Sequence, residues 1–155
     1  MRNLKAIGSC NSADDQFLAV LFGTENDNII AFSEQEWIKK IRSGLPSSAV
    51  TALANKMDVP QKVIAAWLHT TTRTIQRNMD ANIPLGLDLS DRVAQLTRVY
   101  CRCRDVFKDD SKIACWLKSP NYALGNVTPA SLLDTIPGME IVLDELGRIE
   151  HGVFI

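Results

Sequence analysis

An apolar repeat in residues 89–107 restricts the fold of this chain more than any other feature. Its steps are four, three, four, three and four residues, through Leu89, Val93, Leu96, Tyr100, Cys103 and Phe107. Steps of three and four are the spacing of one face of an α-helix, whereas a half-buried strand alternates at steps of two. The repeat therefore predicts one amphipathic helix of about five turns, which begins with Ser90 as its N-cap and ends near residue 108.

Start and stop signals divide most of the remaining chain into shorter helices. Side chains that can cap a helix N-terminus stand at four of the expected starts: Ser33, Ser47, Thr71 and Thr128. Gly138 precedes a last expected helix over residues 139–149. Only residues 29–32 resemble a strand. The sequence thus predicts an all-α fold.

The composition is that of a globular protein without a membrane segment. Hydrophobic residues make up 46% and charged residues 23% of the chain, close to the averages of about 45–50% and about 25%. The longest apolar run, residues 17–22, is far shorter than the roughly 20 residues of a membrane span. The N-terminus has no secretory pattern. We expect a cytoplasmic protein.

No residue pattern predicts catalysis, a cofactor or a metal. His69 and His151 lack a ligand partner three or four positions away, and no glycine-rich phosphate loop or catalytic triad spacing occurs. The four cysteines are too few and too unevenly spaced for a disulfide framework, so reduced thiols are expected. The sequence predicts a binding protein rather than an enzyme.

Residues 60–80 have the pattern of a helix-turn-helix. The second helix of such a motif needs apolar residues inward, here Ile75 and Met79, and hydrogen-bonding groups outward. The candidate DNA-binding residues are Thr72, Arg73, Thr74, Gln76 and Arg77. Arginine can bind guanine with two hydrogen bonds, and glutamine can read adenine. His69 stands at a turn position where glycine is common, and Thr70 stands where an apolar residue is usual. The alternative is a solvated helix face on an ordinary bundle.

Several C-terminal motifs follow the long helix in a specific order. They are Trp116-Leu117, Pro120-Asn121-Tyr122-Ala123-Leu124-Gly125, Thr128-Pro129-Ala130-Ser131-Leu132-Leu133-Asp134-Thr135 and Leu146-Gly147-Arg148-Ile149-Glu150-His151-Gly152-Val153-Phe154. Together with the helix-turn-helix, this order resembles the Xre/MbcA/ParS-type antitoxins, the partners of RES-domain toxins. The resemblance covers about residues 45–155. His151 stands where several family members have tyrosine or another residue.

The resemblance implies an antitoxin that represses its own operon and neutralises a RES-type toxin. Toxins of that type degrade NAD, and the C-terminal domain of the antitoxin covers their active-site entrance. Residues 121–125 and 128–135 are interpreted as turns and caps that set the fold. The last segment offers the candidate toxin contacts: Arg148, Glu150, His151 and Phe154. The alternative for this segment is simple closure of the helical bundle.

These observations predict three regions: an N-terminal extension over 1–44 that could dimerise, a helix-turn-helix region over 45–88 and a toxin-binding domain over 89–155. Residues 47–109 carry nine basic and six acidic side chains, and residues 110–155 carry three and six. This asymmetry suggests different partners for the two parts. The expected partners are a RES-domain toxin, operator DNA and a second copy of the chain. The alternatives are a transcriptional regulator without a toxin partner, and an adaptor that has lost DNA binding.

Overall fold

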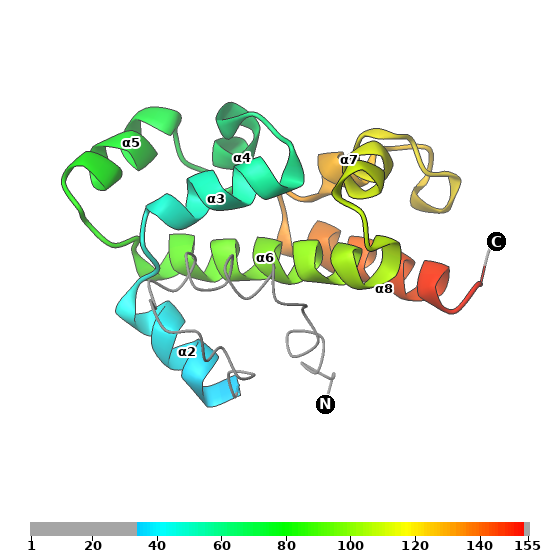
Figure 1. The fold of residues 1–155 in the computed structure, drawn as a ribbon, viewed down its shortest axis with the longest axis horizontal. Coiled ribbons are helices and arrows are strands. Elements are labelled where there is room, and N and C mark those ends of the chain that lie inside the picture. The colour runs from blue at the N-terminus through cyan, green and yellow to red at the C-terminus, as the bar shows by residue number, and fades with distance from the viewer. Residues whose placement is uncertain (1–33, 154–155) are drawn as a thin grey trace.

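The computed structural model describes residues 34–153 and has the helical architecture expected from the sequence. It contains seven α-helices and two 3-10 helices (Figure 1): α2 (Glu34–Ser43), α3 (Ser48–Met57), α4 (Gln61–Trp67), α5 (Thr72–Asp80), α6 (Leu87–Phe107), α7 (Asp110–Lys118), η2 (Tyr122–Leu124), η3 (Pro129–Leu132) and α8 (Ile136–Glu150). No strand lies within residues 34–153, and the all-α prediction is confirmed. The expected strand at 29–32 and the Ser33 cap lie outside the described residues.

Helix α6 is the centre of the molecule. It packs against α2, α3, α7 and α8, with its largest contact on α8. Figure 1 shows α6 running through the molecule, with α5 near its N-terminal end and α7 near its C-terminal end. The helices that come before and after α6 in the chain therefore share one core.

The predicted apolar face of α6 is confirmed, but α6 is buried over a wider arc than that face. Val93, Leu96, Tyr100 and Cys103 are fully buried, and the two ends of the repeat, Leu89 and Phe107, are partly buried. Other buried side chains lie outside the repeat: Ala94, Thr97, Val99 and Cys101. A helix covered from several sides buries more than one stripe. Burial also raises the pKa of the Cys103 thiol to about 12.

Neither Ser47 nor Ser90 caps a helix as predicted. Ser47 stands at the N-cap position of α3, but its hydroxyl donates to the Ile83 carbonyl at 2.7 Å and makes no cap hydrogen bond. Helix α6 begins at Leu87, with Gly86 at the N-cap, and Ser90 lies within the first turn, fully buried. Its Oγ donates to the Leu85 carbonyl at 3.2 Å and accepts from the Leu45 N–H at 3.0 Å. Since buried backbone groups need partners, Ser90 joins the connection between α2 and α3 to the start of α6.

Gly138 lies inside the last helix rather than before it. Helix α8 begins at Ile136, and its N-cap, Thr135, accepts a hydrogen bond from the Gly138 N–H at 3.1 Å. A Cβ at position 138 would lie 1.9 Å from the Leu132 carbonyl oxygen. Glycine is therefore needed here because the first turn of α8 touches the backbone of η3.

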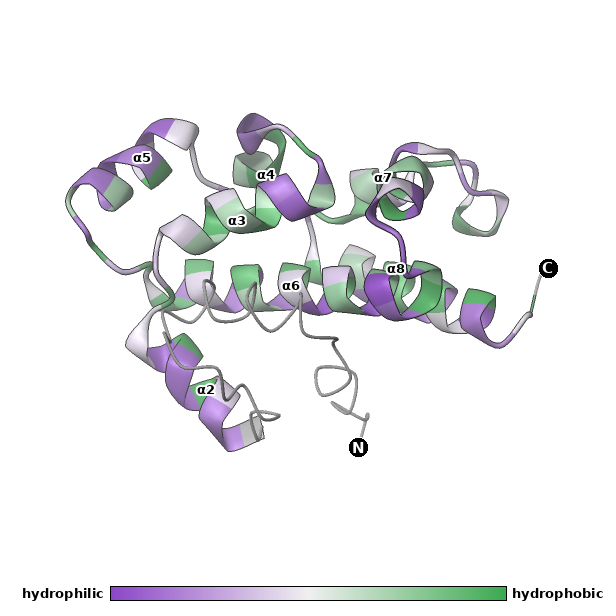
Figure 2. Ribbon diagram, viewed as in Figure 1, coloured by the Kyte–Doolittle hydropathy of each residue, from purple (hydrophilic) through white to green (hydrophobic). Residues whose placement is uncertain are grey.

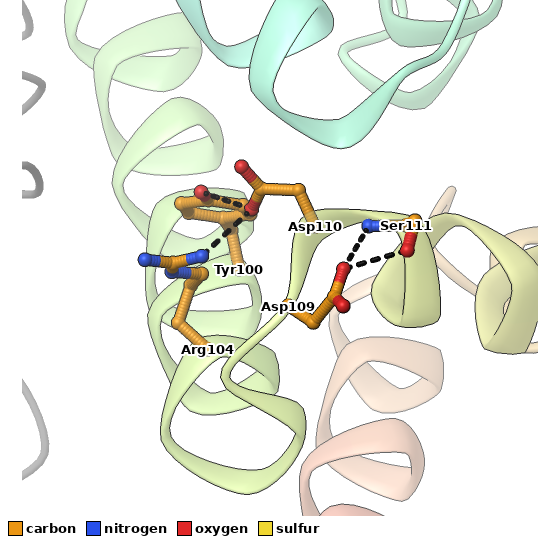
Figure 3. A network of polar contacts seen from close by, with 5 residues as sticks. All are labelled: Tyr100, Arg104, Asp109, Asp110 and Ser111. Carbon is orange, nitrogen blue, oxygen red and sulfur yellow. Dashed lines mark hydrogen bonds and ion pairs between the residues drawn. The ribbon is translucent and has the colours of Figure 1, made fainter.

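A polar network joins α6 to the start of α7 (Figure 3). Asp109 caps α7, and its Oδ1 accepts hydrogen bonds from the backbone N–H and the hydroxyl of Ser111, at 2.8 and 2.6 Å. The neighbouring Asp110 accepts from the Tyr100 hydroxyl at 3.0 Å and from Arg104 at 3.2 Å.

The Ser111 hydroxyl, followed by its backbone N–H, lowers the pKa of Asp109. This cap stabilises the fold above the ordinary carboxyl pKa, and the contribution is lost as the pH falls through the lowered value.

His69 links the helix-turn-helix to the C-terminal helices. It has the left-handed backbone expected from its turn position, with φ of 55°. Its Nε2 lies 2.7 Å from the carbonyl oxygen of Asp134, which is 65 residues further along the chain, just before α8. Histidine thus serves this turn in place of glycine because its side chain bonds to a second part of the fold.

Substitutions at His69 should separate its two roles. His69→Ala loses the bond to Asp134 and keeps an unfavourable left-handed residue, so the free energy of unfolding should fall by about 1–2 kcal/mol. His69→Gly loses the same bond without the backbone penalty and should be about 1 kcal/mol more stable than the alanine variant. Urea denaturation measures both. Equal stability of His69→Ala and the unsubstituted chain would contradict this assignment.

Candidate functional site

The α4–turn–α5 unit presents one polar helix to solvent. Thr71 caps α5 and accepts the Thr74 N–H at 3.1 Å, as the sequence predicts. Ile75 is 1% exposed and anchors the helix to the core. Figure 2 shows α5 as a largely hydrophilic helix at one end of the molecule. The unit therefore has the inner anchor and the outer polar face that a recognition helix requires.

The five candidate DNA-binding side chains all lie on α5, but they are not equally available. Thr72, Arg73, Gln76 and Arg77 are exposed, whereas Thr74 is half-buried and its hydroxyl lies 3.0 Å from that of Thr71. The Gln76 amide donates to Asp80 Oδ1 at 2.8 Å. A base contact by Gln76 would require it to leave Asp80.

The charges around α5 favour a polyanion. Arg73 and Arg77 are four residues apart, so they lie on neighbouring turns of one helix face. Across α3–α5, residues 48–80 contain four basic side chains, Lys56, Lys62, Arg73 and Arg77, against the acidic Asp58 and Asp80. A net positive region with two arginines on one helix face can bind phosphates and base edges.

The second candidate surface lies at the end of α8. The Arg148 guanidinium is an ion-pair partner of Glu145, with 3.2 Å between Nη1 and Oε2, and its side chain is 41% exposed. Glu150 forms an ion pair with Arg102 of α6. His151 has 75% of its side chain exposed and lies 4.0 Å from Glu150. Phe154 lies outside the described residues. Of the predicted toxin contacts, Arg148 and His151 are thus accessible, whereas Glu150 also holds α8 to α6.

A tight loop beside α8 presents an aromatic side chain that the sequence reading did not select. The Asn121 N–H donates to the Val127 carbonyl at 3.0 Å, and the Asn126 N–H donates to the Asn121 carbonyl at 2.9 Å. Gly125 and Asn126 turn the chain with φ of 79° and 62°. Tyr122 stands out from this loop with 78% of its surface exposed. The one available signal was an aromatic residue directly after a turn-forming asparagine.

Tyr122 and Arg148 line two adjoining pockets. The larger pocket has a volume of about 470 Å³ and also includes Ala123, Gly125 and Asn126. The smaller one has a volume of about 190 Å³ and is also lined by Asn121, Ala123, Glu145, Ile149 and Val153. The loop and the end of α8 therefore form one continuous concave surface, which we call the Tyr122–Arg148 surface.

Asn121 connects this loop to the buried carboxylate of Glu145. Its Oδ1 accepts the Ala123 N–H at 2.8 Å and so caps η2. Its Nδ2 lies 3.5 Å from Glu145 Oε1, a long contact. Glu145 is 6% exposed, on the inner side of α8. Asn121 therefore caps the turn and also contacts a buried residue that lines the smaller pocket.

Two further properties of residues 34–153 bear on function. Among them, no group of three or more histidine, cysteine, aspartate or glutamate side chains has a geometry that could hold a metal ion. No helix in this range is both long and apolar enough to cross a membrane.

Two domain families match this chain, one on each side of the middle of α6. The Antitoxin Xre-like helix-turn-helix domain matches residues 36–98. The Antitoxin Xre/MbcA/ParS C-terminal toxin-binding domain matches residues 103–152. The first match includes most of α2 and all of α5, and the second includes Tyr122 and Arg148. Both are binding domains, and neither is an enzyme.

Two named antitoxins and one solved structure are also similar to this chain. An "Antitoxin Xre" of Photorhabdus laumondii is 34% identical over 114 residues, which cover 73% of this chain and 77% of the relative. A "Prs ADP-ribosylating antitoxin" of a Sphingobium species is 29% identical over 123 residues, 74% and 77% of the two chains. The crystal structure of the M. tuberculosis MbcT–MbcA toxin–antitoxin complex contains a chain with the same fold. Its TM-score is 0.56 at 21% identity, and the match covers 70% of this chain and 96% of that one.

Substitutions at Asn121 should show how far the loop depends on this side chain. Asn121→Ala removes the η2 cap and leaves Glu145 without its amide neighbour, so the free energy of unfolding should fall by about 1–2 kcal/mol. Asn121→Ser keeps a cap oxygen but is too short to reach Glu145, so its loss should be smaller. Thermal unfolding followed by circular dichroism compares the two. The assignment fails if the alanine variant unfolds like the unsubstituted chain.

Proposed function

The chain belongs to the Xre/MbcA/ParS antitoxin family, and we propose that it neutralises a RES-domain toxin that consumes NAD. We further propose that it represses its own operon as a homodimer. The observation that carries the first proposal is the Tyr122–Arg148 surface within the matched toxin-binding domain. Tyrosine and arginine are the residue types most often found at the energetic centre of protein interfaces.

Neutralisation by this chain requires contact and no chemistry. The proposed toxin-binding surface comprises Tyr122 and the predicted Arg148, Glu150, His151 and Phe154. An enzyme that binds NAD needs basic groups near the two phosphates, and the chain beyond residue 109 has a net charge of −3 from six acidic and three basic side chains. Opposite charges guide association and favour the correct partner. An acidic cap over the active-site entrance would exclude NAD sterically.

Two toxin chemistries fit this proposal, and both consume NAD. A hydrolase transfers the ADP-ribose of NAD to water, and an ADP-ribosyltransferase transfers it to a target protein. The name of the Sphingobium relative includes ADP-ribosylation of Prs, which favours testing the second chemistry as well. Loss of NAD without a labelled protein would indicate hydrolysis, and label transferred from NAD to a protein would indicate ADP-ribosylation.

The proposed operator binding depends on α5. Arg73 and Arg77 are exposed on one face of a capped helix whose other face is anchored by Ile75. Dimeric helix-turn-helix proteins read two half-sites about 34–36 Å apart. A palindromic operator beside the toxin–antitoxin genes is therefore the expected target. The sequence suggests six apolar side chains for dimerisation by the extension. Four of them, Phe17, Leu18, Leu21 and Phe22, lie outside the described residues, whereas Trp37 is buried in the core of this chain and Ile41 is partly buried against it.

The double variant Arg73→Ala/Arg77→Ala should lose operator binding. Each arginine that reads a guanine contributes about 1–3 kcal/mol, so the double variant should bind at least about 30-fold more weakly. Lys112→Ala/Lys118→Ala is the matched control, because it removes the same charge from α7. Fluorescence anisotropy at fixed salt measures both. Equal weakening by the two variants would show a general charge effect and contradict readout by α5.

Substitutions on the Tyr122–Arg148 surface should release the toxin. Tyr122→Ala and Arg148→Ala are each expected to weaken toxin binding by about 2 kcal/mol or more if they are central to the interface. Cells that co-express the toxin with the combined variant should stop growing and lose NAD. Leu87→Ala is the matched control for Tyr122→Ala, since Leu87 is 57% exposed at the opposite end of α6.

The same co-expression assay separates the two functions. Because Arg73 and Arg77 lie on α5, away from the proposed toxin surface, their double alanine variant should still protect cells when it is expressed from an independent promoter. Full protection by a folded Tyr122→Ala/Arg148→Ala chain would instead place the toxin contact on another surface.

A further inference from the structure

The carboxylate of Glu145 is buried at the wall of the smaller pocket without a hydrogen bond to one of its oxygens. Glu145 is 6% exposed, and Oε2 has no hydrogen-bond partner among the described residues. Arg148 Nη1 comes within 3.2 Å of Oε2, but it is not aligned to donate. The other oxygen, Oε1, accepts a long hydrogen bond of 3.5 Å from the Asn121 amide.

Such a group is incompletely stabilised in the free protein. A carboxylate can accept about four hydrogen bonds, and a buried one that lacks donors keeps much of its desolvation cost. In most proteins these groups have donors from the protein or from ordered water. Here Glu145 lines a pocket of the exposed Tyr122–Arg148 surface, and its Oε2 is shielded from solvent in the free chain. A donor from outside can therefore reach Oε2 and complete its coordination when the Arg148 side chain beside it turns away.

We propose that this pocket receives a cationic side chain of the toxin, an arginine or a lysine, which donates to Glu145. The inference rests on the proposed function, because it assumes that the toxin covers the Tyr122–Arg148 surface. The acceptor is Glu145, which is not among the toxin contacts predicted from the sequence, and the group that it binds is a cation.

The size and the lining of the pocket favour a side chain over other occupants. Its volume of about 190 Å³ is below the roughly 300–1,000 Å³ of small-molecule sites. Glu145 is the one acidic residue in its lining, and the cationic Arg148 stands beside it, which disfavours a metal ion. A toxin that binds the phosphates of NAD has basic side chains at the entrance that the antitoxin covers.

Arg148 can leave Glu145 when the toxin group enters. Its side chain is 41% exposed, so it can turn outward to an acceptor on the toxin. One ion pair within the free chain is then replaced by two contacts across the interface. A charge pair that is desolvated at an interface contributes mainly to slow dissociation.

The first test is the affinity of the full chain for its purified cognate toxin, measured by surface plasmon resonance. Glu145→Gln keeps the shape of the side chain and removes its charge, and it should weaken binding about 10- to 100-fold, mostly through faster dissociation. Asp144→Asn removes one charge from an exposed position of the same helix and should change the affinity by less than about threefold. Similar effects of the two variants would overturn the proposal.

A double-variant cycle distinguishes a direct acceptor from a residue that only positions Arg148. If Glu145 binds a toxin group itself, Glu145→Gln should still weaken binding at least about fivefold in an Arg148→Ala background. If Glu145 acts through Arg148 alone, the second substitution will have no further effect, and the proposal is wrong. Circular dichroism melting of each variant confirms that it is folded.

A variant at the mouth of the pocket tests the proposal without changing Glu145. Ala123 is exposed and lines the pocket, so Ala123→Leu should obstruct entry while leaving the core intact. It should weaken toxin binding to a similar extent, and unchanged binding would overturn the proposal even if Glu145→Gln did not fold. Failure of the unsubstituted chain to bind the toxin would refute the proposed function itself. Equal binding by the unsubstituted chain, Glu145→Gln and Ala123→Leu would refute the Glu145 inference alone.

Discussion

The burial of α6 against helices from both ends of the chain is the interaction on which the rest of the structure depends. Four fully buried side chains of the apolar repeat, and further buried positions outside it, join α2, α3, α7 and α8 to one helix. Each large apolar side chain that is removed from water contributes about 1.5–3 kcal/mol. The two matched domains meet within α6, between residues 98 and 103. The chain therefore matches two separate domain families in sequence, but the two matched regions share a single hydrophobic core.

This shared core carries both of the proposed binding surfaces. Helix α5 and the C-terminal end of α8 lie at opposite ends of the molecule (Figure 1). Polar contacts add to the apolar ones: His69 bonds to the Asp134 carbonyl at 2.7 Å, and Lys118 lies 2.9 Å from Asp58. The second of these pairs is exposed and contributes little. The first connects the turn of the helix-turn-helix directly to the segment that starts α8.

Several side chains on the two surfaces already have partners in the free protein. Gln76 is bonded to Asp80, Glu150 is paired with Arg102, and Arg148 is paired with the buried Glu145. Because Gln76 and Arg148 must leave these partners in the proposed complexes, these contacts reduce the net gain on binding. They also mean that exposure alone does not identify a contact residue. Glu150 holds two helices together, whereas the neighbouring His151 is largely free to meet a partner.

The sequence by itself determined the helices and much of the helix-turn-helix. The apolar repeat of α6, the Thr71 and Thr128 caps and the left-handed turn at His69 are local patterns, and the structure has each of them. The sequence did not determine the start of α6, the role of Gly138, the exposure of Tyr122 or the burial of Glu145. Serine is a common N-cap residue, but Ser90 bonds to the Leu45 N–H instead. Position 138 must be glycine because a Cβ there would collide with the backbone of η3. Glu145 meets Asn121 across 24 residues. A helical period shows which positions share a face of the helix. Which buried carboxylate lines a pocket is decided by the packing of α8 against the 121–127 loop, because that contact joins residues far apart in the sequence.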